Sequence, residues 1–356
     1  MVGRELWVSQ VDPRSSAARA LAGYGIPQMT VRTPGGAQLL RTLGRQAGHE
    51  PMPLLVDDRG VEASGDAVLW RLAANSKRPL FIEEGGRLLV WLIAHYFDEW
   101  VHRAVLHSRW RHRCDSEEAE ATLGGEWIGS LPWGRQWVGK VVGRVQRGRR
   151  LEMGVEPAND AALEESMYRL LVALEELLAE EGPYLFGGHP TVADFTAYGA
   201  LIQFRADPTG RRRLASHQAI HRYVDRMDAM AARPATVEVV QRSPVSVVRL
   251  GALVAEVMAT LWPLMIHNQR AREVGRSIVD IELADGHRFR CHPTRVLEQR
   301  LEQILAEISA VYERQPDLFG VAGLRLERAV IDGVARLCGS PGGRRLLRNY
   351  RRLGKG

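Results

Sequence analysis

The first 83 residues of this 356-residue chain alternate between short apolar runs and helical patterns, and this alternation limits the possible folds most strongly. Apolar runs predict strands, and amphipathic stretches predict helices. The predicted order is strand 5–9, helix 13–24, strand 28–32, helix 36–46, and a strand within 52–60 that is entered through Pro53. Gly25 favours the end of the first helix, because glycine readily adopts the left-handed conformation. This order indicates an α/β domain over residues 1–83.

From about residue 84 the strand signals stop and helical signals replace them. Apolar residues recur at three- and four-residue intervals, the spacing of a buried helical stripe. The two clearest stripes are Leu89, Ile93, Phe97, Trp100 and Ala104, and Leu163, Met167, Leu170, Leu174 and Leu178. Thr191 and Asp194 have the spacing of a capping box, which predicts that another helix begins there. Residues 84–243 are therefore expected to form an all-helical domain.

Two further segments interrupt or extend this plan. Residues 111–159 form an insertion rich in glycine and arginine, and residues 244–356 form a carboxy-terminal extension. The extension begins with a long apolar helix and continues with a hairpin, whose turn is Asp285–Gly286. Another helix starts near residue 296, and the chain closes with a basic tail over 344–355. We therefore expect three sections, with boundaries at 83/84 and 243/244.

Charge and cysteine content narrow the functional classes. The formal charge is +6, from 48 basic and 42 acidic residues, and this total does not by itself indicate nucleic-acid binding. Three widely spaced cysteines argue against a disulfide framework and a cysteine-rich zinc module. The most apolar stretch, 250–266, is interrupted by Glu256 and Pro263 and is too short to span a bilayer. We expect a cytoplasmic protein without a membrane span, for which nucleic acid is not an expected partner.

Specific motifs within this order resemble the glutathione S-transferase superfamily. The amino-terminal motifs are Leu6-Trp-Val-Ser9, Asp12-Pro13-Arg14-Ser15, Met52-Pro53-Leu-Leu55, Gly60 and Ser64. The carboxy-terminal motifs are Phe97-Asp-Glu-Trp100, Leu106-His-Ser-Arg-Trp110, Tyr184-Leu-Phe-Gly-Gly-His-Pro-Thr-Val-Ala-Asp-Phe195 and Tyr223-Val-Asp-Arg-Met227. The resemblance implies a thioredoxin-like amino-terminal domain followed by the all-helical domain of that family. It also implies glutathione as a co-substrate and a homodimer.

The resemblance assigns a glutathione site to particular residues. It implies a cis peptide at Met52–Pro53, with the Met52 backbone receiving the cysteinyl backbone of glutathione. The γ-glutamyl carboxylate is expected at Ser64 and Gly65, at a helix start, because the free amides there favour anions. Arg14 is a further candidate for binding this anionic ligand.

Two positions depart from the family pattern. Asp12 occupies the position of the catalytic hydroxyl, and a carboxylate beside a developing thiolate raises the pKa of the thiol. Ser9, Ser15 or Ser16 could supply the hydroxyl, and Arg14 or Arg19 could offset the charge. Alternatively, Ser15 caps the following helix. Ala63 stands where the family has an acidic residue before Ser64, and Glu62 or Asp66 could take the place of that residue. The departures suggest either a different ligand or no glutathione.

Two other clusters allow alternative interpretations. His95, Asp98, Glu99 and His102 are spaced to share one helical face, as a metal site, an acid/base cluster or a polar side with ion pairs. The insertion carries Trp127, Trp133 and Trp137 among arginines. These tryptophans could stack on nucleic acid, cover a substrate pocket or pack the insertion against the body.

Three functional hypotheses follow. The first is a glutathione transferase-like enzyme that adds a thiol to a hydrophobic small-molecule electrophile, or assists its isomerisation or elimination. The second is a binding or scaffold protein that keeps the fold without the chemistry. The third is a glutathione-independent enzyme that uses Asp12 as an acid or base. Ser9, Asp12 and Ser15 are the candidate catalytic residues.

Overall fold

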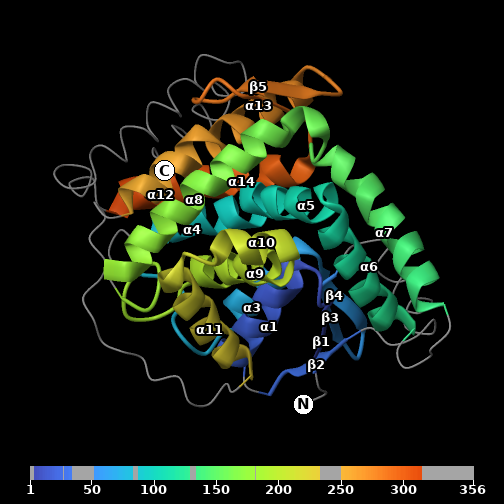
Figure 1. Cartoon of the computed structure of the whole chain (residues 1–356). Coiled ribbons are helices and arrows are strands. Elements are labelled where there is room, and N and C mark those ends of the chain that lie inside the picture. The colour runs from blue at the N-terminus through green and yellow to red at the C-terminus, as the bar shows by residue number, and fades with distance from the viewer. Residues whose placement is uncertain are drawn as a thin grey trace.

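The computed structural model describes residues 4–26, 28–33, 52–82, 87–128, 134–180, 182–232 and 250–314. A small sheet with two helices lies on one side of these residues, and helices make up most of the remainder (Figure 1). The predicted boundaries at 83/84 and 243/244 fall on residues outside these ranges and stay predictions. The predicted helix 36–46 and the basic tail also lie outside them.

The sheet has four strands in the order β2-β1-β3-β4. The strands are β1 (Glu5–Trp7), β2 (Thr30–Arg32), β3 (Leu54–Asp57) and β4 (Gly60–Ser64). β1 runs parallel to β2 and antiparallel to β3, and β3 runs antiparallel to β4. β1, β2 and β3 confirm the predicted strands, whereas β4 is an additional strand. Together with helix α3 (Asp66–Ala74), these strands form the expected thioredoxin-like part.

Helix α1 (Pro13–Gly25) joins this sheet to the helical part of the molecule. It packs against α3 on one side and against α9 (Val192–Ala206) and α11 (Gln218–Ala232) on the other. α9 approaches closely because it has Gly199 at the contact, where a Cβ atom would overlap the carbonyl oxygen of Pro13. Helix α1 confirms the prediction and lies between the two parts of the fold.

The helical part contains both predicted stripes, and all ten stripe residues are buried. The first stripe spans α4 (Arg87–His95), a π-helical turn (Tyr96–Val101) and α5 (His102–Arg111), and the second lies on α8 (Asp160–Glu180). The predicted capping box opens α9: the Asp194 carboxylate accepts hydrogen bonds from the Thr191 backbone amide at 2.8 Å and the Thr191 hydroxyl at 2.9 Å. α10 (Pro208–Leu214) completes this part together with α11.

The glycine-rich insertion forms two helices, α6 (Arg113–Ile128) and α7 (Arg135–Glu152), which pack against each other. Glycine usually weakens a helix, yet here it permits close backbone approach. A Cβ at Gly124 would overlap the carbonyl oxygen of Arg135, and one at Gly139 would overlap that of Glu120. The glycines of the insertion therefore allow the two helices to pack.

The extension begins with two helices rather than the one long helix expected. α12 (Gly251–Ala259) ends before Thr260, and α13 (Leu261–Glu273) follows with Pro263 in its first turn. Proline has no amide hydrogen and clashes with the preceding turn, so it is tolerated where a helix begins. The predicted hairpin, β5 (Val279–Glu282) with β6 (Arg288–Cys291), and the predicted helix, α14 (Arg295–Arg314), are confirmed.

The extension covers the helical part rather than projecting from it. α14 packs on α4 and α13, and α12 packs on α8. Within the described ranges, no helix is long and apolar enough to cross a membrane.

Candidate functional site

Asp12, at the position expected for the catalytic hydroxyl, is the N-cap of α1. Its carboxylate accepts a hydrogen bond from the Ser15 backbone amide at 2.7 Å, and Pro13 occupies the first helical position. Burial raises the pKa of Asp12, although hydrogen bonds from Ser15 partly oppose that effect. Aspartate is among the preferred N-cap residues, so this position has a structural role.

The Ser9 hydroxyl is hydrogen-bonded within the protein, and Ser15 is fully buried. The Ser9 hydroxyl donates to Glu126 of α6 at 2.8 Å, and the Gln10 backbone amide donates to the same carboxylate. Burial raises the pKa of Glu126, although hydrogen bonds from Gln10 and Ser9 partly oppose that effect. Ser15 is fully buried, and its backbone amide donates a hydrogen bond to the Asp12 side chain. Because Asp12 is the N-cap of α1, the predicted capping role of Ser15 is wrong.

Arg14 forms ion pairs with the helical part of the protein. Its Nε lies 2.7 Å from Asp98 Oδ1 and its Nη2 lies 3.2 Å from Glu99 Oε1. Nη2 also donates to the Asp98 carbonyl oxygen at 3.2 Å. The predicted cofactor-binding cation is thus paired with two buried carboxylates, which stand on the π-helical turn.

A second arginine reaches the same carboxylates from the carboxy-terminal extension. Arg300 of α14 places Nη2 2.6 Å from Asp66 Oδ2 and 3.1 Å from Asp98 Oδ2. Its guanidinium also lies 5.5 Å from the centroid of the Trp70 ring. The Arg300 side chain is only 4% exposed. Arg300 therefore links the start of α3 to the π-helical turn.

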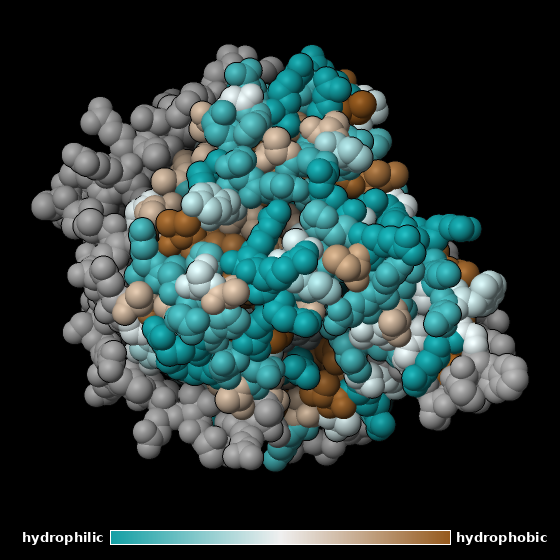
Figure 2. All heavy atoms as spheres, viewed as in Figure 1, coloured by the Kyte–Doolittle hydropathy of each residue, from teal (hydrophilic) through white to brown (hydrophobic). Residues whose placement is uncertain are grey.

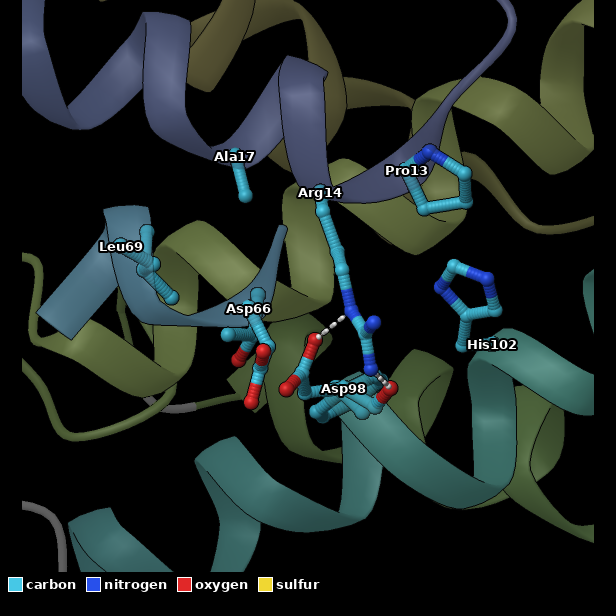
Figure 3. Close-up of a pocket in the computed structure, with 9 residues that line it drawn as sticks. Pro13, Arg14, Ala17, Asp66, Leu69, Asp98 and His102 are labelled. Atoms are coloured by element: carbon cyan, nitrogen blue, oxygen red, sulfur yellow. Dashed lines mark hydrogen bonds and ion pairs between the residues drawn. The ribbon is translucent and has the colours of Figure 1, made fainter. Parts of the chain in front are cut away.

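A small cavity lies beside these ion pairs, between α1, α3 and the π-helical turn. Figure 3 shows Arg14 pointing toward Asp98, with Asp66 and His102 on either side. The cavity encloses about 10 Å³, which is roughly the space of one water molecule. At this position the two parts of the fold enclose little more than a water-sized space.

The four residues of the predicted cluster, His95, Asp98, Glu99 and His102, are all buried. The predicted ion pairs are confirmed at Asp98 and Glu99. Burial and then Arg14 lower the pKa of His102 to about 3, and burial lowers the pKa of His95. Among the described residues, no group of three or more histidine, cysteine or acidic side chains is arranged to hold a metal ion.

The remaining predicted site residues meet at one edge of the sheet. The Met52–Pro53 peptide is cis, and the Pro53 carbonyl oxygen accepts a hydrogen bond from the Gly65 amide at 2.8 Å. Ser64 pairs with Leu54 across β3 and β4. Gly65 has a φ of 57° and immediately precedes α3. The structure therefore brings Met52, Pro53, Ser64 and Gly65 together.

Sequence comparison identifies the helical part. Residues 156–226, which span α8, α9, α10 and most of α11, match the family model described as Glutathione S-transferase, C-terminal domain. The chain thus carries a glutathione S-transferase carboxy-terminal domain over these residues. Its four-stranded sheet and helical remainder are the two parts of the glutathione S-transferase fold. No curated protein matches the sequence.

Solved structures of glutathione S-transferase type are similar to this chain. A GST-like protein from Pseudomonas syringae is 16% identical, with 65% of this chain and 68% of that chain covered and a TM-score of 0.41. Glutathione transferase GSTFuA3 from Phanerochaete chrysosporium is 17% identical, with 65% and 98% covered and a TM-score of 0.45. Beta-etherase LigF from Sphingobium sp. strain SYK-6 is 13% identical, with 64% and 95% covered and a TM-score of 0.43.

Asp66, Arg300 and Glu126 complete the surroundings of the site. Asp66 is one of the two residues expected to replace the acidic residue before Ser64, whereas Arg300 and Glu126 were not predicted. Glu126 is 117 positions from Ser9, and Arg300 is 234 positions from Asp66. Asp66 has a signal in the sequence, because it follows Ser64–Gly65 at the expected helix start. Arg300 and Glu126 have no local signal, since each lies on a helix with many other charged residues.

Proposed function

We propose that this chain is a binding protein with the glutathione S-transferase fold, rather than an enzyme that activates the thiol of glutathione. The observation that carries the proposal is the position of Arg300. This side chain is buried against Asp66, at the start of α3 and directly after the residues expected to hold the γ-glutamyl carboxylate. Asp66 and Asp98 neutralise its charge, so it does not offer an open cation to an anionic ligand.

The surroundings of the expected thiol support the same proposal. Ser9 is hydrogen-bonded to Glu126, Ser15 is buried, and Asp12 caps α1. Thiolate activation needs a donor or a positive charge near the sulfur. Asp12 and Glu126 instead supply two carboxyl groups, and a negative charge on either one would oppose a thiolate nearby.

A second candidate is a glutathione-dependent enzyme that acts on a hydrophobic electrophile. The observation that favours it is the grouping of Met52, Pro53, Ser64 and Gly65 at one edge of the sheet. Under this proposal, glutathione would lie along that edge, and Ser9 or Ser15 would have to turn toward its sulfur. The homodimer and the cytoplasmic location belong to the same set of proposals.

Calorimetric titration of the full chain with glutathione distinguishes the two candidates. A binding protein without the glutathione chemistry gives no saturable heat at millimolar glutathione and no thiol conjugation of an aryl halide. Saturable binding together with conjugation that Ser9→Ala or Ser15→Ala abolishes would establish the enzyme instead.

A further inference from the structure

Helix α7 lies at the outer edge of the molecule (Figure 1). It packs against α6 along one side and touches α5. Buried Gly139 and Gly143 face α6, where the carbonyl oxygen or side chain of Glu120 lies against them. The opposite side of α7 is open to solvent over most of its length.

The open side of α7 carries a line of large apolar residues. Trp137 is 69% exposed, Val141 43%, Val145 53% and Leu151 50%. Their spacing puts all four on one side of the helix, along about 21 Å of its axis. Exposed apolar residues are ordinarily scattered singly, and a contiguous line of them marks an interaction surface. Figure 2 shows hydrophilic side chains covering most of the molecular face in view.

Basic residues accompany this apolar line. The sequence of α7 contains six basic residues and one acidic residue, Glu152. Lys140 and Arg144 are exposed, and their helical positions border Trp137 and Leu151. Arg147 is different, because it pairs with Glu120 at 2.5 Å and lies over the Trp110 ring. Lys140 and Arg144 leave the open side of α7 positively charged.

We propose that the open side of α7 docks on the surface of a membrane that contains anionic phospholipid. An amphipathic helix with tryptophan on its apolar side and basic residues beside it lies in the plane of a lipid interface. Tryptophan suits that depth, because its ring is apolar and its indole N–H can still reach water. Lys140 and Arg144 would face the lipid phosphates.

The chemistry of the line favours lipid over nucleic acid. Single-stranded nucleic acid is held by aromatic side chains that stack on successive bases. Val141, Val145 and Leu151 have no aromatic face for a base, but they gain free energy on transfer into an acyl layer. A membrane is also a flat partner, which a straight helix at the edge of the protein can meet along its whole length.

Cosedimentation of the full chain with vesicles tests this proposal. The chain is expected to bind vesicles made of phosphatidylserine and phosphatidylcholine in equal parts, and to leave vesicles of phosphatidylcholine alone largely unbound. Lys140→Gln and Arg144→Gln are each expected to weaken binding about fivefold. Trp137→Gln and Val145→Gln are each expected to weaken it roughly tenfold, through lost apolar burial. Binding is also expected to fall as salt is added.

Val274→Gln and Arg276→Gln serve as matched controls. These residues are an exposed apolar and an exposed basic side chain beyond the end of α13, and both variants should bind like the wild-type chain. Thermal unfolding of every variant checks that the fold is kept. Equal binding to both vesicle types, or α7 variants that bind as well as the controls, would overturn the proposal. Salt-sensitive binding to single-stranded DNA that the α7 variants lose, without vesicle binding, would assign the surface to nucleic acid instead.

Discussion

The guanidinium of Arg300 lies 2.6 Å from the carboxylate of Asp66, although 234 positions separate these residues in the chain. Arg300 belongs to the last described helix, and Asp66 to the first turn of α3. The same guanidinium contacts Asp98, which also pairs with Arg14 of α1. One ion-pair network thus connects the thioredoxin-like part, the helical part and the extension.

Substitution of Arg300 by glutamine should lower the free energy of unfolding by about 3 kcal/mol, because it leaves the buried Asp98 with less compensating charge. Chemical denaturation of the two proteins measures the difference. Arg272→Gln is the matched control, since Arg272 of α13 pairs with Glu298 of α14 at 2.8 Å but its side chain is 35% exposed. Loss of this partly exposed ion pair should lower the free energy of unfolding by less than about 1 kcal/mol. If the two variants lost equal free energies of unfolding, the burial of Arg300 would make no extra contribution to stability.

The stability of the protein should fall in acid partly through His102. Burial and then Arg14 hold the pKa of His102 at about 3, below its ordinary value of 6.5. The unfolded chain therefore binds a proton that the folded chain does not, so stability is lost as the pH falls from 6.5 toward 3. As the pH falls from about 7 to about 5, His102 lowers the free energy of unfolding by about 2 kcal/mol.

Denaturation of the wild type and His102→Gln at the two pH values isolates this effect. The variant should lose about 2 kcal/mol less than the wild type on acidification. Asp194 and Asp207 act in the opposite direction, because burial raises the pKa of each to about 6. Their contributions are present in both proteins and cancel in the comparison. An identical loss in the two proteins would contradict the assignment to His102.

Gly199→Ala should separate α9 from α1. The new methyl group would overlap the Pro13 carbonyl oxygen and crowd the Cβ of Ala17. Overpacking of this kind costs about 1–3 kcal/mol, and thermal unfolding detects it. Gly125→Ala on α6 is the control, because its Cβ would meet no atom within 4 Å. That control should be neutral or should gain roughly 0.5–1 kcal/mol from higher helix propensity.

Asp12→Ala should cost about 1 kcal/mol of stability, because the N-cap of α1 is lost. Asp12→Asn retains a side-chain oxygen for the Ser15 amide and should be close to neutral. The same pair of variants tests Asp12 as an acid or base. If asparagine preserved the stability but abolished a glutathione-independent reaction of the wild type, Asp12 would have a catalytic role in addition to the cap.

Much of the fold was predictable because its signals are local. The stripe from Leu89 to Ala104 and the Thr191–Asp194 capping box each lie within a few turns of helix, where spacing fixes which side chains meet. The break at Thr260 has a local cause as well, namely Pro263 in the first turn of α13, although one long helix was expected there. Helices α6 and α7 were harder to anticipate, because Gly124 and Gly139 lower helix propensity and are compensated only by contact between the two helices.

The surroundings of the site were less predictable. The motifs indicate Asp12, Met52, Pro53 and Ser64, but they do not indicate that Glu126 binds Ser9 or that Arg300 binds Asp66. The partners of a buried charge are set by which helices pack together, and several arginines of α14 could equally have faced solvent. The same spacing that puts Asp98 and Glu99 on one side of a helix cannot tell whether that side is exposed.

The sequence by itself therefore determined the elements and their family, since periodicity, caps and turns act between residues close in the chain. Tertiary structure alone decided the state of the candidate site. It buried Arg300 against Asp66 and Asp98, because removing those charges from water is tolerable only where opposite charges meet. It also left Trp137 and its neighbours on α7 exposed, because α6 covers only the glycine side of that helix.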